Sequence, residues 1–143
     1  MKKPMKSFLL FVMSVAVMGS IVSCKEEGPH KDDIAKFSAA INTQPAVGTG
    51  AFEYNKVTKE LTYNISYSGV TPTAVSINNA DPAWERGSVL FPLSGFSTSQ
   101  VTGKTRALTD AEVRMLLVGQ LYVNITTAAD PNKEYRGQIL SVE

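Results

Sequence analysis

The residue types that most often carry chemistry are scarce in this chain of 143 residues. Cys24 is its one cysteine and His30 its one histidine. An internal disulfide therefore cannot form. A cysteine-based zinc cluster needs several cysteines, and a nucleophile activated by histidine would depend on His30 alone, close to the start of the chain, so we expect neither. The sequence predicts no catalytic residue, no cofactor and no site for zinc, copper or iron.

The position of Cys24 points to a different role for its thiol. Three lysines lie within the first six residues, and residues 8–18 form an apolar run of eleven. That run is shorter than the roughly 20 residues of a membrane-spanning helix and fits a signal peptide. The following Ile21-Val22-Ser23-Cys24 resembles a lipobox. We expect residues 1–23 to be a lipoprotein signal peptide, cleaved between Ser23 and Cys24, and palmitate or a similar acyl chain on Cys24.

The residues after Cys24 predict where the protein resides. Lys25-Glu26-Glu27 resembles the export signal of bacterial surface lipoproteins, although a polar tether would have the same composition. Gly28 and Pro29 favour a flexible linker, so residues 24–33 form the predicted lipidated tether. We expect an outer-membrane lipoprotein of the cell envelope, exposed at the surface if the export signal operates.

The charge balance narrows the choice of partners. A formal net charge of +1 excludes nucleic-acid binding by bulk electrostatics. The expected partners are the membrane, through the lipid anchor, and an envelope protein or extracellular ligand.

From residue 34 to residue 143 the sequence predicts one all-β domain. In residues 61–67 the large apolar residues occupy odd positions and the polar ones even positions, as in a half-buried strand. Residues 51–54 alternate similarly, and a hairpin loop at 55–59 joins the two segments. Further strands are predicted at 34–41, 73–78, 87–92, 97–106, 120–127 and 135–142. Eight short strands at this spacing favour an antiparallel, Greek-key-like sandwich or barrel.

One short helix is predicted at 110–118. Thr109 and Glu112 have the spacing of a capping box, apolar residues then recur at i, i+3 and i+4, and Gly119 marks the end. We expect this helix to cover one open edge or end of the sheets.

Two motifs that suggest chemistry have simpler interpretations. Thr102-Gly103-Lys104-Thr105 resembles the end of a phosphate-binding loop, but position 98 holds threonine where that loop needs glycine. A β-turn between two strand segments is the better prediction. The carboxylate pair Asp110 and Glu112 fits a helix cap, and Asp130 and Glu134 flank a turn.

Trp84 stands in the longest polar loop, with Arg86 beside it. These two residues form a candidate contact loop for a partner. The interpretation that we favour from sequence is that Trp84 packs its loop onto the edge of the sheet.

Four separated segments resemble the CHRD domain, first described in chordin. Gly48 to Asn55 and Leu61 to Gly69 are similar to its opening hairpin. Leu108 to Asn124 contains its Leu-Thr, Leu-Leu, Gly and Leu-Tyr-Val-Asn elements, and Glu134 to Ile139 resembles its closing segment. The resemblance covers residues 34–142 and implies a Greek-key-like fold. It also implies a family common in secreted and lipid-anchored bacterial proteins, whose molecular function is largely unassigned.

The chain departs from this family at three positions. The family usually has a His-x-His segment and a third histidine, which correspond here to Ser76, Asn78 and Thr126. Three histidines there would invite a transition metal, whereas serine, asparagine and threonine hold one poorly. The resemblance leaves two interpretations for these residues, a polar pocket or a hydrogen-bonded strand surface.

These observations favour a non-enzymatic, lipid-anchored envelope protein with a binding or structural role. Two alternatives remain at the level of sequence. One is an enzyme or metal-handling protein with an unrecognised site, and the other is an accessory subunit of an envelope complex.

Overall fold

The computed structural model describes residues 30–142. The predicted signal peptide, its cleavage site at Ser23 and Cys24, and most of the tether lie outside the described residues. The last tether residues, Lys31–Asp33, form a turn of 3-10 helix, η1. The strands and the helix that follow are β1 (Ile34–Thr43), β2 (Ala46–Asn55), β3 (Leu61–Ser68), β4 (Pro72–Asn79), β5 (Ser88–Leu93), β6 (Gln100–Lys104), α1 (Asp110–Leu117), β7 (Leu121–Thr127) and β8 (Tyr135–Ser141).

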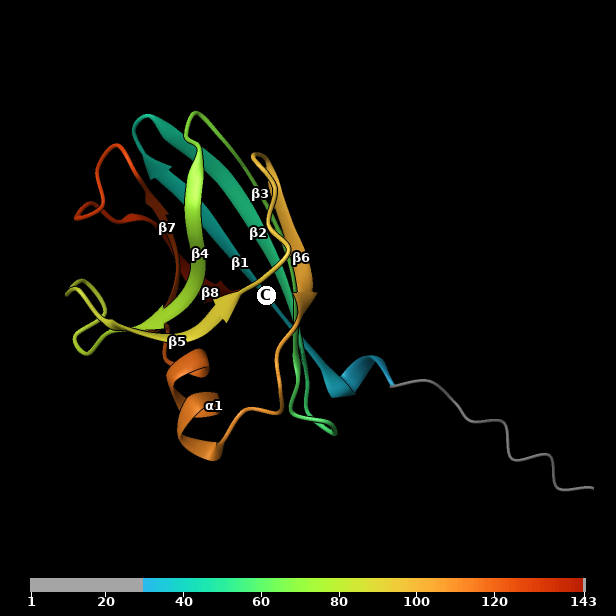
Figure 1. Cartoon of the computed structure of the whole chain (residues 1–143). Helices are drawn as coiled ribbons and strands as arrows, with labels where there is room; N and C mark the ends of the chain where they lie inside the picture. Colours follow the sequence, from blue (N-terminus) through green and yellow to red (C-terminus); the bar gives the residue numbers. More distant parts are fainter. Residues whose placement is uncertain (1–29, 143) are drawn as a thin grey trace, which may run out of the picture.

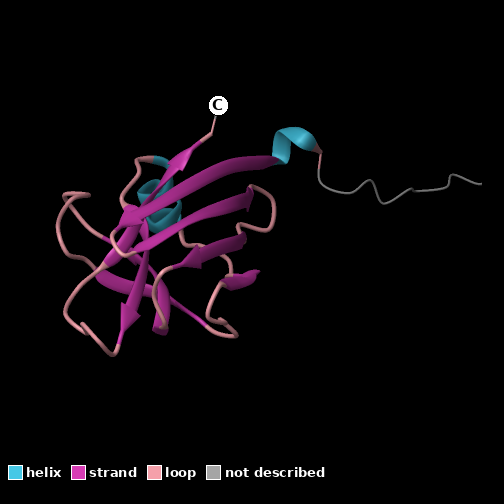
Figure 2. Cartoon of the chain, turned by 90° about the horizontal axis from the view of Figure 1, so that it is seen from above, coloured by secondary structure: helices cyan, strands magenta, loops and turns pink. Residues whose placement is uncertain are grey.

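The eight strands form one antiparallel sheet in the order β5-β4-β7-β8-β1-β2-β3-β6. Figures 1 and 2 show that this sheet curls into a nearly closed barrel around a single core. The prediction of an antiparallel, all-β barrel or sandwich with about eight strands and one short helix is confirmed. The ladders that join β1 to β8, β4 to β7 and β3 to β6 bring distant parts of the sequence together.

The alternation predicted for residues 61–67 sets the register of β3. Leu61 and Ile65 are fully buried in the barrel, with Tyr63 and Tyr67 on the same inner face, whereas the residues between them face solvent. The hairpin loop predicted at 55–59 joins β2 to β3, in the register Phe52 opposite Tyr63.

Strand β6 is shorter than the predicted 97–106. The hydroxyl of Ser97 accepts hydrogen bonds from the backbone N–H groups of Ser99 and Gln100, so a turn replaces the first part of the predicted strand. The predicted β-turn at Thr102-Gly103-Lys104 is wrong, because these residues continue β6. Gly103 pairs with Tyr63, and a β-carbon at position 103 would lie 2.5 Å from the tyrosine hydroxyl. The glycine provides space for an aromatic ring rather than a turn.

Helix α1 begins with the predicted capping box and lies at one end of the barrel (Figure 1). Glu112 accepts from the N–H of Thr109 at 2.8 Å, and both of its carboxylate oxygens bind the Arg106 guanidinium at 2.8 Å. Gly119, with φ of +75°, ends the helix as predicted. The described residues contain no helix that is both long enough and apolar enough to cross a bilayer.

We predict that Glu112→Gln destabilises the domain at neutral pH by about 1–3 kcal/mol, because it removes charge-assisted hydrogen bonds. Arg106 and the Thr109 N–H hold the pKa of Glu112 below its ordinary value. The contribution of the carboxylate is therefore complete above the unfolded-state pKa and is lost as pH falls through the depressed pKa of the folded state. Urea unfolding across this acidic range should show the two proteins converging. A difference in the free energy of unfolding that stays constant with pH would contradict the stabilising role of the ionised Glu112 carboxylate.

Candidate functional site

The outer face of strands β4, β7 and β8 carries a cluster of polar side chains. Ser76 lies opposite Asn124, and Asn124 in turn lies opposite Arg136 on β8. Because side chains alternate along a strand, these residues point away from the core that their neighbours form. This outer cluster consists of Ser76, Asn78, Tyr122, Asn124, Thr126, Arg136 and Gln138. The outer face of a barrel is ordinarily exposed to solvent, yet Ser76, Asn78 and Asn124 are all buried.

Residues 80–87, the loop between β4 and β5, are fastened to this face through Tyr122. The Tyr122 hydroxyl donates to Glu134 Oε1 at 2.6 Å and accepts from the N–H of Gly87 at 2.9 Å. Asn78 Nδ2 lies 3.5 Å from the Tyr122 hydroxyl oxygen. Burial and the hydrogen bond to Glu134 raise the pKa of Tyr122, so the phenol stays protonated at neutral pH and keeps its donor role.

Arg136 is the second attachment of the loop. Its guanidinium lies 3.5 Å from the centroid of the Tyr122 ring, in a cation–π contact. Its two terminal nitrogens donate to the carbonyls of Ala83 and Glu85, both at 2.8 Å. Glu134, 3.2 Å away, balances the charge. The two carbonyls belong to the residues on either side of Trp84, so Arg136 fixes the backbone at that position.

Trp84 itself is 81% exposed. The expectation that it packs its loop onto the sheet is wrong, because Arg136 and Tyr122 hold the loop and leave the indole in solvent. Arg86 is also on the outside, with 59% of its side chain exposed and its Nε 3.8 Å from Glu134. The second interpretation of this segment, a contact loop presenting Trp84 and Arg86, agrees with this exposure.

The structure brings the three positions of the family's histidines onto the same outer face. Ser76 Oγ donates to Asn78 Oδ1 at 2.6 Å, and Thr126 stands two residues from Asn124 on β7. Ser76 and Asn78 thus satisfy one another, as expected for a hydrogen-bonded strand surface. Asn124 Oδ1 differs, because this buried oxygen accepts no hydrogen bond from the described residues. Among the buried side-chain nitrogen and oxygen atoms of the described residues, it alone has no hydrogen-bond partner.

The donor set around these positions does not suit a transition metal. Hydroxyl and amide oxygens are hard, neutral ligands, whereas zinc and copper prefer imidazole and thiolate. Within residues 30–142, no group of three or more histidine, cysteine, aspartate or glutamate side chains lies close enough to hold a metal ion.

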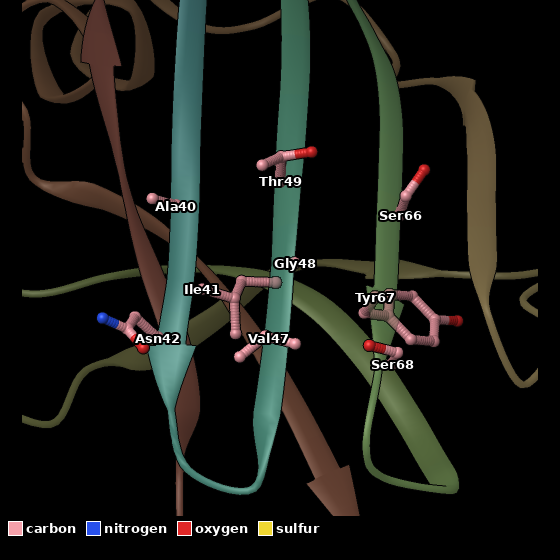
Figure 3. Close-up of a pocket in the computed structure, with 9 residues that line it drawn as sticks. All are labelled: Ala40, Ile41, Asn42, Val47, Gly48, Thr49, Ser66, Tyr67 and Ser68. Atoms are coloured by element: carbon pink, nitrogen blue, oxygen red, sulfur yellow. The ribbon is translucent and has the colours of Figure 1, made fainter.

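A hollow lies elsewhere, on the outer side of β1, β2 and β3 (Figure 3). It measures about 590 Å³ and is wide open. Its outward-facing side chains are small, for example Ala40, Thr49 and Ser66, and Tyr67 turns its hydroxyl away to the carbonyl of Ser97. No charged side chain lines this hollow, so it offers few groups for specific recognition.

Three residues of the site were not singled out in the sequence analysis as parts of it: Tyr122, Glu134 and Arg136. Alternation along β7 could have placed Tyr122 on the outer face, but no sequence signal shows that residues 80–87 fold onto that face. Their role depends on a contact between segments about 50 residues apart, as from Arg136 to Ala83.

Fold and site together define a small antiparallel β-barrel domain that presents one fixed, exposed aromatic loop. The CHRD domain family matches residues 35–139, and the chain belongs to this family. No curated protein and no solved structure matches the chain.

We predict that Arg136→Gln frees the loop and destabilises the domain by about 1–3 kcal/mol, because it leaves two carbonyls without their donor and removes the charged partner of the largely buried Glu134 carboxylate. Hydrogen exchange at Gly87 should accelerate, and the fluorescence anisotropy of Trp84, the chain's one tryptophan, should fall. Arg86→Gln is the matched control, because an exposed arginine near the same carboxylate contributes at most about 0.5 kcal/mol. Equal effects of the two variants would refute the role of Arg136.

Proposed function

We propose that this protein is a lipid-anchored, outer-membrane protein of the cell envelope, in which the single CHRD domain binds an envelope protein or extracellular ligand without catalysing a reaction. The observation that carries the binding role is the exposed Trp84 between two carbonyls that Arg136 holds.

The pattern of residues 1–24 supports the anchor. A basic start, a short apolar run and a cysteine after Ile21-Val22-Ser23 is the arrangement of a lipoprotein signal peptide. Two or more acyl chains on Cys24 would hold the domain stably at a membrane, whereas one chain binds only marginally. Lys25-Glu26-Glu27 favours export to the outer surface.

The geometry of the loop supports binding. A large apolar side chain in water stabilises nothing by itself, whereas Arg136 and Tyr122 hold the backbone of the loop that carries it. Aromatic side chains in a preorganised setting are frequent anchors of interfaces, because little conformational entropy is lost on binding. The polar groups nearby, Tyr122 and Glu134, are already hydrogen-bonded to the fold, which favours a binding role over acid–base chemistry.

The anchor predicts that Cys24→Ser abolishes incorporation of labelled palmitate and releases the protein from the membrane fraction, because the thiol is the acylation site. The measurement is metabolic labelling followed by membrane fractionation. Palmitate that persists in the Cys24→Ser protein would overturn the anchor.

The binding role predicts that Trp84→Ala weakens capture of the natural partner about thirtyfold, the effect of losing about 2 kcal/mol at an interface anchor. The partner is first identified by cross-linking from position 84 in intact cells, and its dissociation constant is then measured with both purified proteins.

The matched control for this measurement is Val47→Ala. Val47 is also exposed, at 40%, but lies in β2 beside the β1–β2 turn, away from the loop. Binding that Trp84→Ala and Val47→Ala affect equally would exclude Trp84 as the contact residue.

A further inference from the structure

Five of the eight large exposed apolar side chains of the described domain lie toward one end of the barrel, whereas Val47, Trp84 and Val89 lie elsewhere. Helix α1 and the turn between β2 and β3 lie at this end (Figure 1), and the last residues of β8 run beside the start of β1. We call it the apolar end, and its residues are Val57, Leu117, Val118, Leu140 and Val142. Their exposed fractions lie between 49% and 71%. Single exposed apolar residues are ordinary, but five at one end are unusual for a free surface.

Contacts between the segments show that these residues belong to one end. The N–H of Val142 donates to the carbonyl of Lys36 in β1, at 2.9 Å. Leu140 lies beside the end of α1, since a β-carbon at Gly119 would be 3.1 Å from its methyl group. Lys59, in the turn that carries Val57, forms a 2.8 Å ion pair with Asp110, so this turn lies beside the N-terminus of α1, whereas Leu117 and Val118 are at the C-terminus of the same helix.

The chain enters the domain at this same end. The carbonyl of Asp33, just before β1, accepts from the N–H of Lys56 in the β2–β3 turn, at 2.8 Å. Nine residues separate Cys24 from Ile34. Even fully extended, they span no more than about 35 Å. A lipid on Cys24 would therefore keep the entry of the chain within about 35 Å of the bilayer, near enough for this end of the domain to reach it.

We propose that the apolar end lies against the lipid bilayer that holds the acyl chains of Cys24, with Val118, Leu140 and their neighbours placed among the lipid headgroups. This inference rests on the proposed lipid anchor. The contact itself can be weak, because anchoring converts it into an intramolecular event at high effective concentration. The contact of the apolar end with the bilayer would give the tethered domain a fixed orientation relative to the membrane.

The charges at this end agree with a shallow contact driven by apolar groups. Lys31 and Lys36 are near the entry of the chain and can meet lipid phosphates, but Glu53 lies beside them. Attraction to anionic lipid is thus partly offset, and the apolar side chains supply the main contact. Loop 80–87 leaves the flank of the barrel, so Trp84 stays available to a partner in this orientation (Figure 1).

The test places an environment-sensitive NBD dye on a single introduced cysteine in the acylated protein, reconstituted into phosphatidylethanolamine–phosphatidylglycerol vesicles. The labelled variants are Val118→Cys and Leu140→Cys, with Val47→Cys at the opposite end as control. We expect a blue shift and quenching by spin-labelled lipid at positions 118 and 140, and neither at 47. All three positions are exposed, so the fold should tolerate them.

The two proposals fail differently in this experiment. Protein that floats with the vesicles but shows the same emission at 118, 140 and 47 overturns the oriented contact and leaves the anchor intact. Protein that does not float contradicts the anchor. The dye comparison is then made with a hexahistidine tag at position 24 on chelator-lipid vesicles, where equal emission again overturns the contact. A shift of Trp84 emission on the vesicles without a shift at 118 would also overturn it, by placing the loop in the membrane.

Discussion

Burial of β7 on both faces is the constraint on which the rest of this structure depends. Its inward residues, among them Val123 and Ile125, are fully buried in the barrel. Its outward residues would face water in an ordinary antiparallel sheet. Here Tyr122 is fully buried as well, because residues 80–87 fold onto it. The barrel core and the outer cluster therefore share one strand, and the contact loop is built on a strand that is buried on both faces.

Arg136 completes this arrangement in a way that few side chains could. A planar guanidinium can donate to two carbonyls from two separate nitrogens while its charged face stacks on an aromatic ring; an ammonium group has no planar face, and a neutral amide has no charge. Burying a charge is costly unless it is paired, and Glu134 provides the pairing. Glu134 also accepts a hydrogen bond from the Tyr122 hydroxyl, so one carboxylate links the two residues that hold the loop. The result is a surface tryptophan with little backbone freedom left to lose on binding.

The domain presents surfaces of two kinds at different places. The loop that carries Trp84 projects from a flank of the barrel, whereas the apolar end lies where the chain enters. The hollow on the outer side of β1, β2 and β3 resembles neither, since no charged side chain lines it and its outward-facing side chains are small (Figure 3). A domain attached at its entry end and contacting a partner through its flank would use these two surfaces without competition between them.

The sequence by itself determined the elements of this fold. Alternation over 61–67, turn residues between strands and the Thr109–Glu112 capping box are local signals, so they predicted the strands, the inner face of β3 and the position of α1. The family resemblance to CHRD domains also came from the sequence. These local patterns gave a wrong prediction in two places. At Ser97, side-chain hydrogen bonds form a turn in place of the predicted strand, and at Gly103 the glycine makes room for the Tyr63 ring within a strand instead of forming a turn.

Only the tertiary structure decided the site. Whether Trp84 packs or projects depends on Arg136, which lies 52 positions further along the chain. That contact exists because the sheet order places β4, β7 and β8 side by side, and no local pattern encodes it.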